Sequence, residues 1–238
     1  MVNELLSVEN IVGGYGKLTV LNGTTLKVAR GALTTVIGPN GAGKSTVFKA
    51  IFGLLRVASG RIVFDGRDIT HLEPRALLEL GISYVPQGRN VFPELSVLHN
   101  LELGTTAAPA RAARIDGLMD RFPMLRKKRD AQASTLSGGE QKLLEIARGL
   151  LLEPKLMLID EPSIGLSPLL VKEIFQTLQD LRAGGMSILM VEQNAKRALE
   201  ISDYGVVLEL GRTRIEAPAD RILADPGIGQ LFLGGALS

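Results

Sequence analysis

The sequence predicts an α/β fold built on a mainly parallel β-sheet with helices on both faces. Short apolar segments such as "ALTTVIG", "KLMLIDEP" and "SILMVEQ" have the length and composition of buried strands. Helical patterns alternate with the later strands, and this alternation is typical of parallel sheets. Near the N-terminus, "NELLSVENIV" and "TTLKVA" follow one another without a helical pattern between them. These early runs predict a second, smaller antiparallel sheet.

The composition narrows the class of protein before any motif is considered. The chain has 238 residues, 45% of them hydrophobic, which is enough for the core of one large domain. A net charge of +2 argues against a nucleic-acid binder. The absence of cysteine excludes disulfides and cysteine-ligated metals, and having only two histidines, His71 and His99, argues against a histidine-ligated metal. Neither a signal-like N-terminus nor an uncharged apolar run of membrane-spanning length is found, so we expect a cytoplasmic chain.

The first half of the chain alternates short strands with one clear helix. A glycine-rich turn leads into the helical pattern "KSTVFKAIFGLL". "GRIVFDG" predicts a strand that ends in a turn at Asp65 and Gly66, and "GISYVPQ" predicts another strand. Strand signals then stop, and helical patterns such as "ARAARIDGLMDRFPMLRKKRD" take over. We therefore predict a helical insertion over residues 88–132.

The β/α alternation returns after the insertion. "GGEQKLLEIARGLLL" and "PLLVKEIFQTLQDLRAGG" predict helices, and an apolar strand follows each of them. "DYGVVLELGRTRIEA" predicts a terminal hairpin. We predict one domain over residues 1–238, in which 1–87 and 133–238 form the core with the antiparallel sheet and 88–132 form a helical subdomain.

The stretch "GPNGAGKST" satisfies the pattern G-x-x-x-x-G-K-[ST]. It follows an apolar strand and opens a helix, which is the context that a phosphate-binding loop requires. Its glycines let successive N–H groups surround a phosphate, and the helix N-terminus adds a positive end. Lys44 supplies a cation to the β- and γ-phosphates, and Ser45 offers a hydroxyl to Mg²⁺. The predicted nucleotide-binding residues here are Gly38, Pro39, Asn40, Gly41, Ala42, Gly43, Lys44, Ser45 and Thr46.

Two carboxylates follow the apolar strand "LMLI". Ligands of parallel sheets bind at the carboxyl ends of the strands, so Asp160 is predicted to hold Mg²⁺. Because neighbouring strand residues point to opposite sides, Glu161 is expected to face elsewhere. We predict that Glu161 faces the γ-phosphate and polarises the attacking water.

A second phosphate-binding surface is predicted at "LSGGEQ", where a helix begins. Ser137 fits the N-cap position and Glu140 the capping-box position, so the plainer interpretation is a well-capped helix. The glycines also expose N–H groups at a positive helix end. Since one nucleotide does not need two such ends from one chain, we expect a head-to-tail dimer in which this surface covers the other subunit's nucleotide. The residues are Leu136, Ser137, Gly138, Gly139, Glu140 and Gln141.

The order "GPNGAGKST", "VPQ", "LSGGEQ" and "LIDEP" resembles the nucleotide-binding subunit of ATP-binding cassette (ABC) transporters over nearly the whole chain. The resemblance implies the P-loop NTPase fold of these ATPases, with a RecA-like core, an antiparallel β subdomain and a helical subdomain, and hydrolysis of ATP with Mg²⁺. It implies that Tyr15 stacks on adenine, although a tyrosine beside glycines is more often a packed loop residue. It also implies that Gln87 reaches Mg²⁺ and the attacking water.

A narrower resemblance is carried by "DEPSIGLSP", "LMVEQNAKRALEISDYGVVLELGR" and the tail "LFLGG". These stretches are similar to the LivF-type ATPases of branched-chain amino acid importers. The related importers of urea and short-chain amides share much of the pattern. Two positions depart from it: Gln87 stands where LivF-like chains often carry Glu, and Ser167 stands where the wider family usually carries Asp.

The resemblance implies partners. They are two integral-membrane permeases, a second ATPase of LivG type or a second copy of this chain, and indirectly a periplasmic binding protein. The subunit would lie on the inner face of the cell membrane through the permeases. We predict that residues 88–95 dock there, because Val91 and Phe92 are apolar with no strand to join. A loop packed in the core is the alternative.

Two other classes of protein fit the sequence less well. Soluble ABC ATPases that act on DNA or ribosomes typically carry tandem cassettes, a long coiled-coil insertion or zinc-binding cysteines, and the 238 residues contain no cysteine and no long heptad run. A P-loop kinase would leave "LSGGEQ" unexplained. An ATPase that energises import is therefore the function that the sequence predicts.

Gln193 follows the strand "SILMV", where ABC ATPases usually place a histidine that touches the γ-phosphate. A glutamine amide donates and accepts hydrogen bonds but does not titrate. LivF-like chains resemble this one in having Gln there. We predict that Gln193 senses the γ-phosphate while Glu161 activates water. Beside a subunit that carries the histidine, the two composite sites would be unequal.

Overall fold

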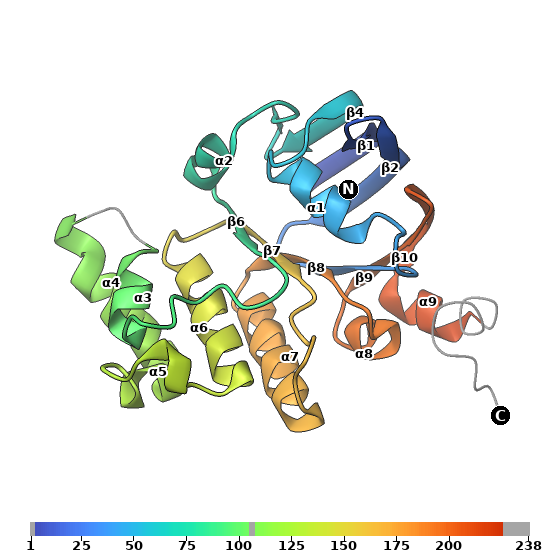
Figure 1. Cartoon of the computed structure of the whole chain (residues 1–238). Helices are drawn as coiled ribbons and strands as arrows, with labels where there is room; N and C mark the ends of the chain where they lie inside the picture. Colours follow the sequence, from blue (N-terminus) through green and yellow to red (C-terminus); the bar gives the residue numbers. More distant parts are fainter. Residues whose placement is uncertain (1–2, 105–107, 226–238) are drawn as a thin grey trace.

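A computed structural model describes residues 3–104 and 108–225 of the chain (Figure 1). Its strands form two sheets, and helices lie between the sheets and against the larger one. The predicted α/β fold with an additional antiparallel sheet is therefore confirmed. The tail "LFLGG" and residues 105–107 of the predicted insertion lie outside the described residues.

The smaller sheet is antiparallel, with the strand order β2-β1-β4-β5. Its strands are β1 (Glu4–Tyr15), β2 (Leu18–Ala29), β4 (Val57–Phe64) and β5 (Arg67–Asp68). Leu6 lies opposite Val28, and Val8 lies opposite Leu26, all four fully buried. These cross-strand apolar pairs form one wall of the core. Figure 1 shows this sheet above α1 (Lys44–Ile51), which it covers.

The larger sheet has the strand order β10-β9-β3-β8-β7-β6. Its strands are β3 (Leu33–Ile37), β6 (Ile82–Val85), β7 (Leu156–Asp160), β8 (Ser187–Val191), β9 (Tyr204–Glu209) and β10 (Arg212–Pro218). The pairs from β6 to β9 are parallel, whereas β10 returns antiparallel to β9, as the predicted hairpin requires. Although β3 follows β2 in the sequence, it leaves the antiparallel sheet and lies between β8 and β9.

The register of the parallel strands aligns their carboxyl ends. Val191 of β8 pairs with Val36 of β3 on one side and with Asp160 of β7 on the other. On the far side of β7, Ile159 pairs with Val85 of β6. Residues that follow β3, β8, β7 and β6 therefore lie in a row along one edge of the sheet, where ligands bind in such folds.

Alternate residues of the central strands enter two different cores. Leu156 and Leu158 of β7 pack in the core formed with α1 and the smaller sheet. Met157 and Ile159 pack in the core formed with α6 (Gly138–Leu150) and α7 (Pro168–Ala183). Burial on both faces explains why these strands are continuous apolar runs instead of alternating ones.

The remaining elements are helices. They are α2 (Pro74–Leu80), α3 (Val97–Glu102), α4 (Ala108–Arg121), α5 (Pro123–Lys127), α6 (Gly138–Leu150), α7 (Pro168–Ala183), α8 (Ala195–Glu200) and α9 (Ala219–Ala224). Sequence analysis missed α2 and α9, which are too short to show a clear helical period. Helices α3, α4 and α5 fall within residues 88–132 and share a core with α6 and α7. The division into subdomains stays a prediction.

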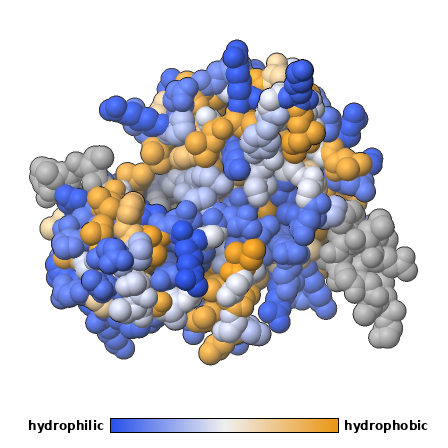
Figure 2. Space-filling view, viewed as in Figure 1, coloured by the Kyte–Doolittle hydropathy of each residue, from blue (hydrophilic) through white to orange (hydrophobic). Residues whose placement is uncertain are grey.

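The surface carries no single apolar band on the face that Figure 2 shows. Apolar side chains there form scattered groups separated by hydrophilic ones. Within residues 3–104 and 108–225, none of the helices combines the length and hydropathy that a membrane span requires.

Gly211, in the turn between β9 and β10, lies against β2 of the smaller sheet. Its N–H donates to the Ala42 carbonyl (2.9 Å), and its own carbonyl accepts from the Asn22 N–H (2.8 Å). Its φ is 73°, and a Cβ there would lie 1.9 Å from the Val20 carbonyl oxygen. A side chain at this position therefore forces the sheets apart.

We predict that Gly211→Ala lowers the free energy of unfolding by at least about 2 kcal/mol more than Gly66→Ala. Gly66 is the matched control, because its φ is also positive (77°) but a Cβ there meets nothing within 4 Å. Urea unfolding of both variants measures the difference. Equal losses would show that backbone conformation alone, without the close approach, decides the effect.

Candidate nucleotide site

The glycine-rich loop connects the end of β3 to the start of α1, as the sequence predicts. Gly38 passes so close to β9 that a Cβ would lie 2.1 Å from the Leu208 carbonyl oxygen. The Lys44 ammonium lies inside the loop and donates to the carbonyls of Gly38 (2.8 Å) and Pro39 (3.1 Å). Burial lowers the pKa of Lys44, and the carboxylates of Glu161, Asp160 and Glu192 oppose this shift. The loop therefore holds a buried cation beside three acids.

Ser45 and Asp160 are brought together from opposite halves of the chain. The Ser45 hydroxyl donates to Asp160 Oδ1 (3.1 Å), and the Tyr84 hydroxyl donates to Asp160 Oδ2 (3.3 Å). Burial raises the pKa of Asp160, and the hydrogen bonds from Ser45 and Tyr84 act against that rise. A hydroxyl and a carboxylate oxygen on adjacent elements are the hard donors that Mg²⁺ prefers, so these residues fit that ion.

Tyr84 is a site residue that sequence analysis missed. It lies in β6, and its ring packs edge-on against Phe48 of α1, with centroids 6.2 Å apart. The available signal was a tyrosine, with its polar tip, two residues before Pro86 and three before Gln87 at the carboxyl end of the strand "ISYV". Tyr84 packs against α1 and orients the Asp160 carboxylate.

Glu161 and Gln87 contact each other at the ends of β7 and β6. Gln87 Nε2 donates to Glu161 Oε2 (2.8 Å). Burial raises the pKa of Glu161, and the neighbouring charge of Asp160 adds to the rise. The two carboxylates do face different partners, but strand pleating is the wrong reason: the strand ends at Asp160, and Glu161 has a left-handed φ of 46°. Such a conformation is uncommon for a residue other than glycine.

Gln193 lies two residues past the end of β8. Its side chain is exposed, and the side-chain amide has no hydrogen-bond partner within residues 3–104 and 108–225. The preceding residue, Glu192, is buried and accepts hydrogen bonds from Ser163. Sequence analysis missed Glu192, although a charge placed directly after the buried strand "SILMV" was the available signal.

Tyr15 ends β1 and is 46% exposed. Its ring lies 5.6 Å from Lys49 Nζ of α1, the helix that the phosphate loop opens. This exposure and the position at the end of a strand do not favour the alternative interpretation, a packed loop residue. The position beside α1 leaves aromatic surface open for stacking, and a role with adenine stays a prediction.

The "LSGGEQ" segment opens α6 with the predicted capping box. The Ser137 hydroxyl accepts from the Glu140 N–H (3.4 Å), and the Ser137 N–H donates to the Glu140 carboxylate (2.8 Å). Lys128 pairs with the same carboxylate at 2.6 Å. In Figure 1, α6 and α1 lie on opposite faces of the larger sheet. Ser137 is exposed, so its surface is open to a second molecule.

The segment after Gln87 is held against α6 by buried charges. Lys142 Nζ donates to the Gly88 carbonyl (3.0 Å) and pairs with Glu145 (2.5 Å). Glu145 accepts from the Asn90 N–H (2.6 Å), and Arg148 donates to the Asn90 carbonyl (2.6 Å). The loop is therefore fixed to the helix that begins with the "LSGGEQ" segment.

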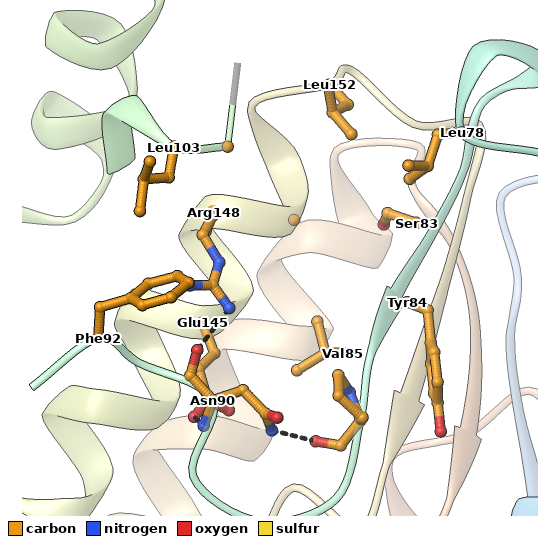
Figure 3. Close-up of a pocket in the computed structure, with 13 residues that line it drawn as sticks. Leu78, Ser83, Tyr84, Val85, Asn90, Phe92, Leu103, Glu145, Arg148 and Leu152 are labelled. Carbon is orange, nitrogen blue, oxygen red and sulfur yellow. Dashed lines mark hydrogen bonds between the residues drawn. The ribbon is translucent and has the colours of Figure 1, made fainter. Parts of the chain in front are cut away.

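A pocket of about 460 Å³ opens beside this segment. Figure 3 shows Phe92 and Leu103 on one side, β6 with Tyr84 and Val85 on the other, and Arg148 between them. The Arg148 guanidinium lies over the Phe92 ring, 5.6 Å from its centroid. Phe92 remains 50% exposed, so it is available to a partner.

The chain belongs to the ABC transporter family, since the family model described as "ABC transporter" matches residues 21–164. It is an ATP-binding subunit of an ABC transporter and an ATPase. BraG of Pseudomonas aeruginosa, a high-affinity branched-chain amino acid transport ATP-binding protein, is 37% identical and covers 97% of this chain and 100% of its own. The probable branched-chain amino acid transport protein LivF of Archaeoglobus fulgidus is 38% identical, covering 97% and 99%.

Other relatives widen the range of transporters. The lipopolysaccharide export protein LptB of Acidithiobacillus ferridurans is 34% identical and covers 98% of both chains. Among solved structures, the ADP conformation of MJ1267, an ATP-binding cassette of an ABC transporter, matches with a TM-score of 0.86 and 32% identity, covering 97% of this chain and 99% of that one. Similarity of fold and sequence therefore extends over the whole nucleotide-binding unit.

We predict that Glu161→Gln raises the thermal midpoint of the metal-free, nucleotide-free protein at pH 7.5. The folded-state pKa of Glu161 lies above its ordinary value of 4.5, so the parent loses stability as pH rises through the folded-state pKa. A neutral amide removes that loss and still accepts from Gln87. A gain of about 1 kcal/mol would raise the midpoint by roughly 2–4 °C.

The advantage of Glu161→Gln is expected to disappear near pH 4, where the parent carboxyl is protonated in both states. Glu79→Gln, at an exposed position of α2, is the control and should change the midpoint little. A difference that stays constant from pH 4 to pH 7.5 would contradict the explanation by buried charge.

Proposed function

We propose that this chain hydrolyses ATP to energise the import of branched-chain amino acids. Support comes from relatives named for that transport at 37–38% identity over nearly their whole length. The stretches "DEPSIGLSP" and "LMVEQNAKRALE" support the same subtype. The same role in a urea or short-chain amide importer is the alternative, and export is a second candidate because LptB proteins are 34% identical.

The phosphate loop would bind the triphosphate through its N–H groups and Lys44. Ser45 and Asp160, already 3.1 Å apart, would hold Mg²⁺ together with Gln87. When bound, Mg²⁺ supplies positive charge against the phosphate oxygens. Tyr15 would stack on the adenine, with Lys49 on its ring.

Glu161 would activate the attacking water. A carboxylate whose pKa is raised by burial is a stronger base than an exposed one, which suits proton acceptance from water. Water would attack the γ-phosphorus as its proton moves to Glu161 and ADP leaves. Gln87 fixes the orientation of this carboxylate at 2.8 Å. Gln193 would donate its amide hydrogen to the γ-phosphate.

A head-to-tail dimer would complete each site. The exposed Ser137 and the N–H groups of Gly138 and Gly139 would contact the γ-phosphate bound by the other subunit. That subunit would be a LivG-like ATPase or a second copy of this chain. Two permeases would hold the dimer on the cytoplasmic face of the membrane, and a periplasmic binding protein would deliver the substrate.

The pocket beside residues 88–95 would receive a cytoplasmic segment of a permease. Its apolar surface includes the exposed side chains of Phe92 and Leu103. The backbone of Asn90, which lines this pocket, is hydrogen-bonded to Glu145 and Arg148 of α6. Docking there would act on both Gln87 and the "LSGGEQ" segment, because the same loop and helix connect them.

Hydrolysis provides the first test. We expect Glu161→Gln to lower kcat by about 10²–10⁴-fold while the dissociation constant for MgATP changes little, because the amide cannot accept a proton. Phosphate release and binding of a fluorescent ATP analogue measure the two quantities. Glu79→Gln should match the parent in both. Retained hydrolysis in Glu161→Gln would show that another group activates the water.

Transport assigns the substrate. In proteoliposomes containing this subunit and the permeases and binding protein encoded beside it, ATP on the subunit's side should drive uptake of leucine. Urea and acetamide are the comparison substrates. If urea or acetamide is taken up and leucine is not, that compound replaces leucine as the proposed substrate. ATP-driven transport in the opposite direction, toward the side that carries the binding protein, would indicate export.

Docking is tested with Phe92→Ala. We expect this variant to weaken assembly with the permeases and to reduce ATP-driven uptake by at least about tenfold, as loss of an aromatic anchor does at an interface. Leu54→Ala is the matched control, because Leu54 is 54% exposed but lies three residues beyond the end of α1, outside the pocket. Unchanged assembly and uptake in a folded Phe92→Ala protein would exclude the segment.

A further inference from the structure

Glu192 is a buried acid for which the proposed hydrolysis has no role. Only 1% of its surface is exposed. Oε1 accepts from the Ser163 N–H (2.9 Å), and Oε2 accepts from the Ser163 hydroxyl (2.9 Å) and the Gln193 N–H (3.0 Å). One carboxylate thus joins the loop after β7 to the residue that follows β8.

The main chain holds Glu192 in place from two sides. Its N–H donates to the Val36 carbonyl of β3 (3.3 Å), so it extends the ladder by one residue. On the other side, the Glu161 N–H donates to the Val191 carbonyl (2.9 Å). The left-handed turn at Glu161 then directs the chain so that Ser163 meets the Glu192 carboxylate.

The hydrogen bonds define what kind of role Glu192 can have. Both of its oxygens are occupied by donors from Ser163 and Gln193. Burial raises the pKa of Glu192, while these bonds and one from the Asn194 N–H lower it. A carboxylate engaged in this way is not free to bind water or a metal. It can set the positions of the groups that it joins.

We propose that Glu192 is a positioning residue that fixes the loop 162–167 to the backbone of Gln193. Glu161 and Gln193 lie at the two ends of this connection, so it holds them at a constant separation during hydrolysis. The inference rests on the catalytic roles proposed above for Glu161 and Gln193. Glu192 and Ser163, which are hydrogen-bonded to each other, would act in this way without contacting the nucleotide.

The test uses the full chain and four variants. Glu192→Gln replaces one acceptor oxygen by an NH₂ group, which cannot accept from the donors around it. Ser163→Ala removes one hydrogen bond from the half-exposed partner and leaves the backbone bond, so it should fold even if the Glu192 variant does not. Ser163→Thr keeps the hydroxyl and is the matched control. The double variant Glu192→Gln, Ser163→Ala measures coupling.

We expect Glu192→Gln to lower kcat by about 10–100-fold and Ser163→Ala by about 3–10-fold, as for misplaced catalytic groups. KM and the dissociation constant for MgATP should change by less than about threefold, since the Glu192 carboxylate bonds to Ser163 and to the Gln193 N–H and, among the described residues, has no hydrogen bond to the phosphate loop. Ser163→Thr should restore kcat, and the double variant should be no slower than Glu192→Gln. Hydrogen exchange at the Ser163 amide should accelerate in Glu192→Gln.

Three results would overturn the proposal. In the first, the losses of kcat caused by Glu192→Gln and Ser163→Ala multiply in the double variant. In the second, the Ser163→Thr protein is as slow as Ser163→Ala, and in the third, MgATP affinity falls by as much as kcat. The separate Glu161→Gln measurement distinguishes failure of the proposed function. If that variant still hydrolyses ATP while Glu192 and Ser163 remain coupled, the connection is present but serves a different catalytic group.

Discussion

The candidate site depends on one constraint, the parallel hydrogen-bond ladder that joins β3, β8, β7 and β6. Its register aligns Val36, Val191 and Asp160 across three neighbouring strands. The phosphate loop, Gln193, Glu161 and Gln87 come from four distant parts of the sequence, yet each follows one of these strands by a residue or a few. Burial of both sheet faces fixes that register, because a slip of one residue would exchange the two apolar cores.

The same edge of the sheet concentrates groups that do not favour folding. Asp160, Glu161 and Glu192 are all buried acids whose pKa values are raised by burial, and Lys44 is a buried cation whose pKa is lowered. Glu161 also has a left-handed backbone conformation. Strain and buried charge of this kind persist only where the surrounding structure holds them, and they mark functional sites. The two apolar cores supply that support.

The sequence predicted most of the fold, because long apolar strands and the capped helix α6 follow local rules. The capping box of Ser137 and Glu140 could be read from spacing alone. The departure of β3 from the antiparallel sheet into the larger one could not be read in this way, because strand pairing is decided by contacts between residues that are distant in the sequence. Glu192 and Tyr84 were missed for the same reason: each acts through a partner about 30 or more residues away. The roles of the predicted site residues stay predictions, which the experiments above test.

Ser137 shows how a helix cap can limit the choice of residue. Its oxygen accepts from the Glu140 N–H, so its own proton is left for another acceptor. Serine, aspartate and asparagine cap helices about equally well. An ionised aspartate has no proton to give. Helix stability alone therefore does not select serine over aspartate at this position, whereas the serine hydroxyl gives the exposed end of α6 a hydrogen-bond donor that an ionised aspartate lacks.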